Sequence, residues 1–357
     1  MRERQTFEKS LRSLVTVVVG IVLVASCDAT PMPAEDTSVE GAVSSTAKLH
    51  PIGAIPESAA TMHAAPTAAP ALLGPLPSVV DLSSELPPVG DQGSEGSCVG
   101  WAVAYSTKTL QEVVENHWLP DDTTHEFSPS WIYNQINGGH DNGSQISTAL
   151  SLVVGSGVDT MSSFPYVDGD FLSQPNATSK SRAAHYKGAS WATVGVSTTN
   201  FKNVIASGNA VIVGFQVLPD MDLMNGTTNT VYDTDVGSRN AATYSPCPSD
   251  CTGICNGVGK CGTCNTTTNV CTVPACTTNC TRGGHAVALV GYDDGVGAFK
   301  FINQWGAGWD GNGYGWLAYS FITDADLALQ AFVMTDATDV PGVQDSVMIW
   351  EESHVPL

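Results

Sequence analysis

The chain has 357 residues, 42% of them hydrophobic, which is enough to bury one large domain or two ordinary ones. Asp and Glu number 35 against 14 Lys and Arg, and the formal net charge is −21. Such a polyanion repels phosphate backbones and anionic lipid headgroups, so the composition argues against nucleic-acid binding and against membrane adhesion through a basic patch.

The first 27 residues have the layout of a secretory signal peptide. A basic start precedes an apolar run, residues 14–25, that is shorter than the about 20 residues of a membrane-spanning helix. The run ends in Val-Ala-Ser-Cys27, which resembles a bacterial lipobox whose cysteine is acylated. An ordinary signal-peptidase site with an incidental cysteine is the alternative. We therefore expect an extracytoplasmic protein, secreted or lipid-anchored at the cell envelope, with Cys27 as its one membrane attachment.

Residues 28–78 are rich in Ala, Pro, Ser and Thr and contain almost no aromatic side chains. Such a stretch buries too little apolar surface to offset the entropy of ordering it. The composition therefore predicts a flexible tether, and a short propeptide within the same stretch is the alternative.

The folded domain is predicted to span residues 79–335, and its first half is mostly helical. Apolar residues recur at helical spacing over 98–117, and Ser97 stands at the N-cap position of that predicted helix. Further helices are predicted at 128–135, after a Ser-Pro start, and at 147–154, before a Gly-Ser-Gly break.

Short β-prone runs dominate the chain after residue 190 and predict an antiparallel sheet or barrel. A Cys-rich segment, residues 244–282, is flanked by Gly-, Asn- and Thr-rich sequence and reads as an insertion into this half. Residues 336–357 are expected to form a C-terminal tail. The β-prone runs are 191–196, 210–217, 286–292, 298–302 and 315–319.

Eight of the ten cysteines fall close together in the predicted insertion. An even number in an oxidising compartment predicts four disulfides. A zinc cluster is the alternative, but only one pair has the tight Cys-x-x-Cys spacing and the segment contains no histidine, so we predict no metal site. The eight residues are Cys247, Cys251, Cys255, Cys261, Cys264, Cys271, Cys276 and Cys280.

A single cysteine with a distant histidine and asparagine is the usual sequence footprint of a thiol nucleophile. Three blocks carry these residues in chain order: PVGDQGSEGSCVGWA with Cys98, GGHAVALVGY with His285, and FINQWGAGWDGNGY with Asn303. They resemble the cysteine, histidine and asparagine segments of papain-like cysteine peptidases. Residues 127–133, 164–166 and 208–215 also look like landmarks of that family. The resemblance covers about 79–335, with the Cys-rich insertion outside it.

The resemblance implies an α+β papain-like fold of two lobes, a helical lobe and a β-barrel-like lobe, with the active-site cleft between them. It implies that Cys98 is the nucleophile, that His285 is its base and that Asn303 orients the histidine. Gln92 would donate its side-chain amide to the oxyanion alongside the backbone N–H of Cys98. Trp305 would shield the bond between His285 and Asn303 from water and line the substrate site.

The chain departs from the plant and lysosomal members of that family. Glu95 stands where they carry a disulfide cysteine, and Val99-Gly100 follows the nucleophile where they have an aromatic residue. No helical propeptide motif precedes the domain. These departures indicate a divergent bacterial-type branch. Gly143 and Ser144 are the candidate substrate-binding residues at the cleft edge, and a surface turn is the alternative for them.

The expected activity is thiol-dependent endopeptidase hydrolysis through a thioester intermediate, with no cofactor. The expected partner is a protein or peptide substrate, not nucleic acid, and the expected state is a monomer. A noncatalytic surface adhesin on a peptidase fold is one alternative. An amidase or transpeptidase that uses the same thioester is the other.

Overall fold

The computed structural model describes residues 50–70, 74–120, 123–218, 282–325 and 327–336, with short stretches at 221, 224, 231–232, 242–244, 263–265, 267, 270–273 and 347–350. All of them belong to one compact unit of the chain, Ser44–Leu357. The predicted signal peptide and lipobox, and the side chains of the eight clustered cysteines, lie outside the described residues and stay predictions. Within the described ranges, no helix is long and apolar enough to cross a membrane.

A continuous helical segment stands where the sequence predicts the buried helix. It consists of α2 (Cys98–Gly100), the π-helical η2 (Trp101–Lys108) and α3 (Thr109–Asn116). Its residues are buried from Cys98 to Val113, as the apolar spacing predicts. The segment ends at His117, which takes a left-handed conformation with φ 54°.

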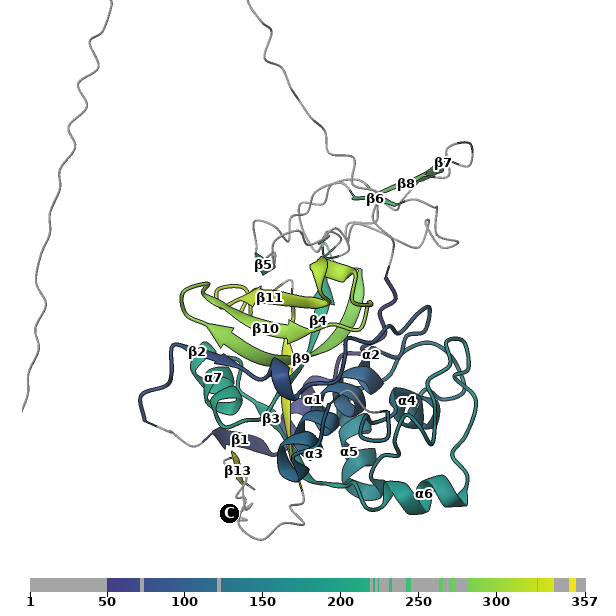
Figure 1. Ribbon diagram of the computed structural model, residues 1–357. Coiled ribbons are helices and arrows are strands. Elements are labelled where there is room, and N and C mark those ends of the chain that lie inside the picture. The colour runs from purple at the N-terminus through teal and green to yellow at the C-terminus, as the bar shows by residue number, and fades with distance from the viewer. Residues whose placement is uncertain are drawn as a thin grey trace, which may run out of the picture. The chain divides into compact units, whose positions relative to one another are not determined.

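The other predicted helices form close to their predicted bounds (Figure 1). The helix α4 (Pro129–Ile136) begins at Ser128, whose hydroxyl accepts the backbone N–H of Trp131. The helix α5 (Ile146–Ser156) ends at a glycine with φ 79°. The remaining helical elements are η1 (Ser83–Glu85), α6 (Ala177–Ala183), α7 (Thr198–Ala206) and η5 (Trp309–Gly311).

The strands form a mixed sheet in the order β13-β1-β3-β12-β4-β9-β10-β11-β5, with β2 beside β9. The pairs β1–β3 and β5–β11 are parallel and the others are antiparallel. The expected barrel-like lobe is therefore wrong in one respect: β13 and β5, at the two ends of the order, do not pair, so the sheet is open. The strands are β1 (Thr67–Pro70), β2 (Val79–Asp81), β3 (Gly188–Val194), β4 (Val211–Val217), β5 (Val231–Tyr232), β9 (Gly283–Asp293), β10 (Ala298–Ile302), β11 (Tyr314–Ala318), β12 (Gln330–Asp336) and β13 (Val347–Trp350).

Two short strands within the predicted insertion, β7 and β8, and the strand β6 at its N-terminal boundary form a sheet of their own, in the order β6-β8-β7. Both pairs are antiparallel, and the backbone of Cys264 lies opposite that of Cys271. The described strands β7 and β8 of this segment thus pair in a separate small sheet, and the insertion itself stays a prediction. The strands are β6 (Ala242–Tyr244), β7 (Thr263–Asn265) and β8 (Val270–Val273).

The strand β9 is buried on both faces and holds the two halves of the fold together. Ala286 packs in a core cluster with the helical residues of α2, η2, α4 and α5. Val287 and Leu289 point to the opposite face and pack with the residues of β4, β10 and α7. Burial on both faces explains why the sequence of β9 is almost continuously apolar. The small side chain of Ala286 leaves room for the helix to approach the strand.

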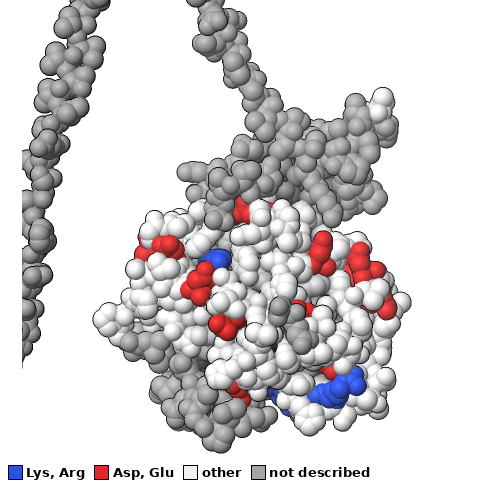
Figure 2. All heavy atoms as spheres, in the orientation of Figure 1, with Lys and Arg blue, Asp and Glu red and all other residues white. Residues whose placement is uncertain are grey.

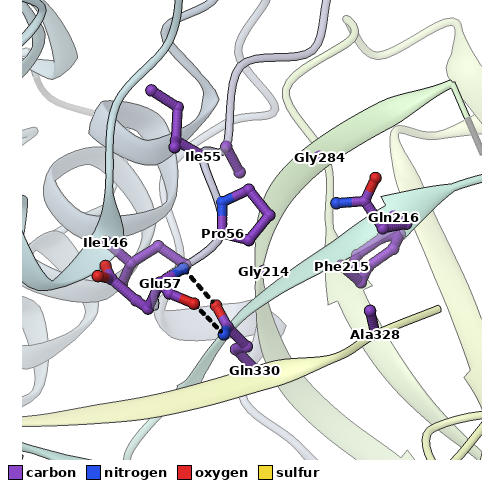
Figure 3. Close-up of a pocket in the computed structure, with 11 residues that line it drawn as sticks. Ile55, Pro56, Glu57, Ile146, Gly214, Phe215, Gln216, Gly284, Ala328 and Gln330 are labelled. Atoms are coloured by element: carbon purple, nitrogen blue, oxygen red, sulfur yellow. Dashed lines mark hydrogen bonds between the residues drawn. The ribbon is translucent and has the colours of Figure 1, made fainter. Parts of the chain in front are cut away.

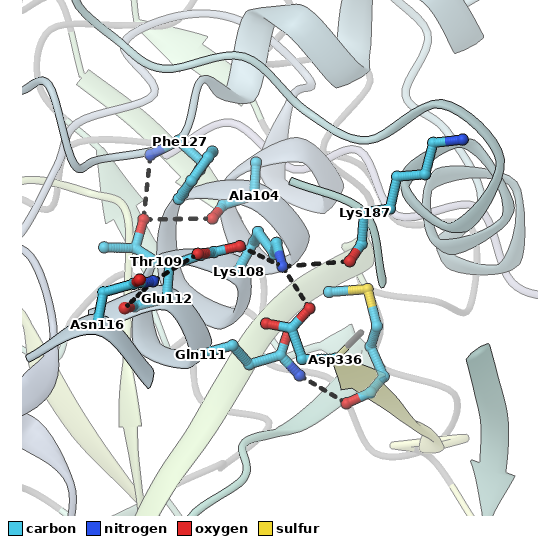
Figure 4. Close-up of polar contacts among 10 residues, drawn as sticks. Ala104, Lys108, Thr109, Gln111, Glu112, Asn116, Phe127, Lys187 and Asp336 are labelled. Atoms are coloured by element: carbon cyan, nitrogen blue, oxygen red, sulfur yellow. Dashed lines mark hydrogen bonds and ion pairs between the residues drawn. The ribbon is translucent and has the colours of Figure 1, made fainter. Parts of the chain in front are cut away.

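A buried ionic cluster joins the central helix to β12 (Figure 4). The Lys108 side chain is fully buried, and its Nζ lies 2.5 Å from Asp336 Oδ1 and 2.7 Å from Glu112 Oε1. Lys108 Nζ also donates to the carbonyl of Lys187. Gln111, one turn away, donates to the carbonyl of Met334 on β12 at 2.7 Å. The positive charge therefore has two carboxylate partners, as a buried ammonium requires.

The basic side chains on the face shown in Figure 2 form small groups among scattered acidic ones. One such group lies over α6, which contributes Lys180 and Arg182. The guanidinium of Arg182 pairs with Asp159 at 2.7 Å. On this face the basic residues are thus few and partly neutralised.

The second half of the predicted tether is an ordered arm, residues 50–70, in the structure. The helix α1 (Ala59–Ala64) is capped by Ser58, and β1 adds to the main sheet beside β3. Ala54 and Glu57 are buried. The tether prediction is therefore wrong over this stretch. The prediction counted apolar side chains, whereas the backbone hydrogen bonds that β1 makes with its two neighbouring strands help to offset the ordering entropy.

Candidate active site

Cys98 opens the first turn of α2 and is fully buried. Ser97 occupies the N-cap position, as predicted, but its side chain makes no capping hydrogen bond, and its hydroxyl lies 2.7 Å from the hydroxyl of Tyr166 instead. Burial raises the pKa of Cys98 to about 12, whereas the backbone amides of Ala286, Gly53 and Val99 act to lower it. The thiol is therefore neutral near pH 7 in this state.

His285 and Asn303 form the hydrogen bond that the resemblance implies. His285 lies on β9, and its Nε2 is 2.9 Å from Oδ1 of Asn303, in the loop after β10. The indole of Trp305 stacks on the imidazole at 4.6 Å between ring centroids and 29° between planes. Burial lowers the pKa of His285 to about 3, against the effect of Asn303 and with smaller contributions from Arg282 and His50. The ring is therefore held in place and neutral.

The helix α2 packs against β9, and the backbone N–H of Ala286, the residue after His285, hydrogen-bonds the sulfur of Cys98. The other ring nitrogen, Nδ1, has no hydrogen-bond partner among the described residues. Nδ1 of His285 is therefore not hydrogen-bonded to the sulfur of Cys98.

Two glutamine side chains belong to the segments that carry Cys98 and Asn303. Nε2 of Gln92 donates one hydrogen to the carbonyl of Glu95 at 2.7 Å, and the amide carries a second hydrogen. Gln304 was not singled out from the sequence. Its Nε2 donates to the carbonyl of Ala286 at 2.9 Å and lies 3.3 Å from Nε2 of His285. Its position directly after Asn303 was the signal that could have identified it.

The arm passes through the predicted substrate edge. The backbone N–H groups of Gly53 and Ala54 both donate to the carbonyl of Gly284, at 3.0 and 2.9 Å. Ser144 donates its N–H to the carbonyl of Gly53 at 2.8 Å and accepts the N–H of Ile55 at 2.9 Å. The sequence-predicted residue Ser144 therefore binds an extended backbone, which is the property expected of a substrate-binding residue, and here that backbone belongs to the chain itself.

The fit of the arm is tightest at two glycines. A Cβ atom on Gly53 would lie 2.0 Å from the carbonyl oxygen of Gly96, in the loop before Cys98. A Cβ atom on Gly143 would lie 2.1 Å from the carbonyl oxygen of Gly53, and Gly143 also has φ 85°. Side chains are therefore excluded at both positions, and the role of Gly143 in binding substrate stays a prediction.

The next part of the arm, residues 54–57, forms one wall of a pocket (Figure 3). The side chain of Gln330 bonds both backbone groups of Glu57, accepting its N–H at 2.8 Å and donating to its carbonyl at 2.9 Å. The carboxylate of Glu57 accepts the N–H of Ser147 at 2.9 Å in the first turn of α5. The pocket is also lined by Ile146, Gly214, Phe215 and Ala328.

We expect the arm-closed state to be most stable between the ordinary pKa values of the two buried groups. His285 has its pKa lowered from 6.5 to about 3, so opening the site takes up a proton, and acid below about pH 6.5 favours the open state. Cys98 has its pKa raised from 9.0 to about 12, so opening releases a proton, and base above about pH 9 also favours it. Hydrogen–deuterium exchange at the N–H groups of Ala54 and Ile55 measures the opening. Opening free energies that are constant from pH 4 to pH 10 would contradict the role of the arm in burying these groups.

The structure is similar to solved cysteine proteases. Xylellain, a cysteine protease from Xylella fastidiosa, matches with a TM-score of 0.58 and 23% identity, over 82% of this chain and 98% of xylellain. A digestive procathepsin L2 proteinase of Tenebrio molitor larval midgut matches with a TM-score of 0.54 and 18% identity, over 80% and 78% of the two chains. The proform of the ragweed pollen allergen Amb a 11, a cysteine protease, matches at 0.52 and 18%, over 75% and 67%.

The comparison with curated proteins gives a consistent match. The chain is 23% identical over 259 residues to an uncharacterized peptidase C1-like protein of Acanthamoeba polyphaga mimivirus, with 70% of each chain covered. No family model matches the chain. Taken with the solved structures, the chain has the α+β fold of the papain-like cysteine proteases, and the prediction of that fold is confirmed.

Proposed function

We propose that the chain is a thiol-dependent peptidase in which Cys98 attacks the carbonyl carbon of a peptide bond. One observation carries the proposal: His285 is bonded to Asn303 at 2.9 Å beneath Trp305, on the strand that packs against the helix of Cys98. A cysteine at a helix N-terminus beside an oriented imidazole is the arrangement that ionises a thiol when water and substrate enter the site. The fold shared with solved cysteine proteases supports the same reaction.

The reaction proceeds in two steps, acylation of Cys98 and hydrolysis of the resulting thioester, and His285 transfers a proton in each. The thiolate of Cys98 adds to the carbonyl, and the N–H of Cys98 with the free Nε2 hydrogen of Gln92 stabilises the oxyanion. The imidazolium of His285 then protonates the leaving amine, which breaks the C–N bond and leaves a thioester. In the second step His285 removes a proton from water, which attacks the thioester, and the carboxylic acid leaves while the thiol is restored.

The chain as described is a latent form of this peptidase. Residues 50–57 occupy the cleft through backbone hydrogen bonds to Gly284 and Ser144, and His50 stacks on Trp305 with ring centroids 4.6 Å apart. Arg282 donates to the carbonyl of His50, and Trp305 donates to the carbonyl of Pro51 at 3.1 Å. Because a substrate would need the same backbone partners, the arm must leave before a substrate can bind.

Replacement of Gly53 by valine should activate the full-length chain. The new side chain meets the backbone carbonyl of Gly96, which cannot move without shifting the loop of Cys98, so the arm yields instead. Overpacking of this kind costs about 1–3 kcal/mol, which corresponds to roughly five- to 150-fold more open chain. The measurement is kcat/KM for a small peptide amide in full-length protein.

The matched control for this variant is His63→Ala, also in the arm. His63 lies exposed in the last turn of α1, away from the cleft, and its loss should leave the activity unchanged. Equal activities of the parent chain, Gly53→Val and His63→Ala would show that the arm does not restrain the enzyme.

The same thioester could pass its acyl group to an amine rather than to water, as in a transpeptidase. Adding a primary amine to the Gly53→Val chain distinguishes the two reactions, since an amidated product appears only if the amine captures the acyl group. We propose hydrolysis, with a protein or peptide as substrate. A noncatalytic adhesin would need neither the hydrogen bond between His285 and Asn303 nor the stacking of Trp305 on His285.

A further inference from the structure

Glu95 is a buried acid in the loop that carries the oxyanion donor. Its residue is only 1% exposed, and one carboxyl oxygen, Oε1, has no hydrogen-bond partner among the described residues. The other oxygen, Oε2, lies 3.0 Å from the hydroxyl of Tyr166. No step of the proposed reaction uses this carboxyl group. A buried acid with so few partners needs a separate explanation.

The hydrogens around Tyr166 can be counted. Its hydroxyl oxygen lies 2.8 Å from the carbonyl oxygen of Gln92, 3.0 Å from Oε2 of Glu95 and 2.7 Å from the hydroxyl of Ser97. The single hydrogen of Tyr166 can go to the carbonyl of Gln92 or to Glu95, and the carbonyl of Gln92 also accepts the backbone N–H of Glu95 at 3.3 Å. All three contacts of Tyr166 are hydrogen bonds at once only if Tyr166 donates to Gln92 and Glu95 supplies a proton to Tyr166. An ionised Glu95 would leave two acceptors competing for one hydrogen.

The charges nearby act in the same direction. Asp141 and Asp168 are the acids that face Glu95, and both are bonded to its loop: Asp141 accepts the N–H of Gly96, and Asp168 accepts the N–H and hydroxyl of Ser94, all at 2.8 Å. Burial raises the pKa of Glu95 to about 7 with the help of both acids, against the hydrogen bonds from Tyr166 and from the backbone of Gly169, which lower it. An uncharged Glu95 therefore agrees with the geometry and with the charges around it.

The loop connects this proton to the oxyanion donor. The backbone carbonyl of Glu95 accepts Nε2 of Gln92 at 2.7 Å, and Tyr166 holds the carbonyl of Gln92. Gln92 is thus restrained at both its side chain and its backbone by the two groups that share the proton. Loss of the proton would place a charge against the Tyr166 oxygen and loosen both restraints.

We propose that Glu95 is a positioning residue that works as a neutral carboxylic acid, whose proton holds Tyr166 and, through it, the oxyanion donor Gln92. The inference rests on the proposed peptidase function. Because the pKa of Glu95 is raised to about 7, the carboxyl group is protonated below that pH and loses its proton above it. The loop is therefore held most tightly in acid and loosens as the pH rises through about 7. A peptidase regulated in this way works best in a mildly acidic medium.

The first test is the pH profile of kcat/KM in the activated Gly53→Val chain. Between about pH 6 and pH 8 we expect a fall of about tenfold, because the protonated fraction of a group with pKa 7 falls by that factor. Glu95→Gln keeps a neutral side chain that can donate to Tyr166, so it should match the parent at pH 6 and lack the fall. Glu95→Ala, which cannot donate, should be slow at both pH values. A Gln variant that falls like its parent would overturn the proposal.

A second readout is independent of activity. The carboxyl carbon of Glu95, followed by NMR in the latent chain and assigned by its loss in Glu95→Gln, should titrate near pH 7 rather than near 4.5. The side-chain amide of Gln92 should shift with the same midpoint, and this shift should be absent in Glu95→Gln. A midpoint near 4.5, or an unmoved Gln92 amide, would overturn the inference. If both signals titrate as expected but no variant hydrolyses peptides, the proposed function fails and the coupling of Glu95 to Gln92 stands.

Discussion

Replacement of Cys98 by alanine in the Gly53→Val chain should reduce kcat/KM for peptide amides by at least about 10⁴-fold. The substitution removes the atom that attacks the carbonyl but deletes only one buried sulfur, so the fold should remain. Initial rates at several substrate concentrations give the loss, and circular dichroism with a thermal melt shows that the variant is folded.

Asn303→Ala is the comparison for that result. Asn303 bonds the ring of His285 but does not react, so this variant should retain measurable activity. Unchanged hydrolysis in Cys98→Ala would refute the thiol mechanism. A loss in folded Asn303→Ala as deep as that in Cys98→Ala would refute the orienting role alone.

Replacement of Lys108 by methionine should lower the free energy of unfolding by about 3–5 kcal/mol. Methionine fills a similar volume, but Glu112 and Asp336 would be left as buried carboxylates without a positive partner. Burial already raises the pKa of Glu112, and Lys108 opposes that shift. Urea unfolding of the full chain, compared at one pH, measures the difference.

The matched control is Lys300→Met. Lys300 pairs with Asp81 at 2.8 Å, but the Asp81 side chain is 48% exposed, so water screens the pair. Its loss should cost less than about 1 kcal/mol. If the two lysine variants lost similar free energies of unfolding, burial would not be the reason that the Lys108 cluster stabilises the fold.

The sequence was most informative where local signals agree with tertiary packing. Ser128 and Pro129 determine where α4 begins, and Gly157 determines where α5 ends. Both helices therefore lie within about two residues of their predicted bounds. The sequence of β9 is apolar on both faces, which is typical of a central strand, and His285 lies on this strand. The pairing of His285 with Asn303 followed from their motifs rather than from any spacing between them.

Other features depend on contacts between segments far apart in the chain, which no local pattern encodes. The arm is ordered by backbone bonds from Gly53 and Ala54 to Gly284, and such bonds leave little trace in side-chain composition. From the sequence alone, Lys108 would be placed on the solvent-exposed side of its helix. Only the fold brings its partner Asp336 beside it. The open form of the sheet follows from the strand order, which periodicity does not fix.

The central claim is that peptide hydrolysis passes through a thioester on Cys98. The most direct measurement is peptide mapping by mass spectrometry of the Gly53→Val chain, quenched in acid during turnover of an activated acyl ester that deacylates slowly. We expect the acyl group on the peptide that contains Cys98, removable by hydroxylamine, and no acylation in Cys98→Ala. An acyl group mapped to another residue, with the same turnover in Cys98→Ala, would contradict the claim.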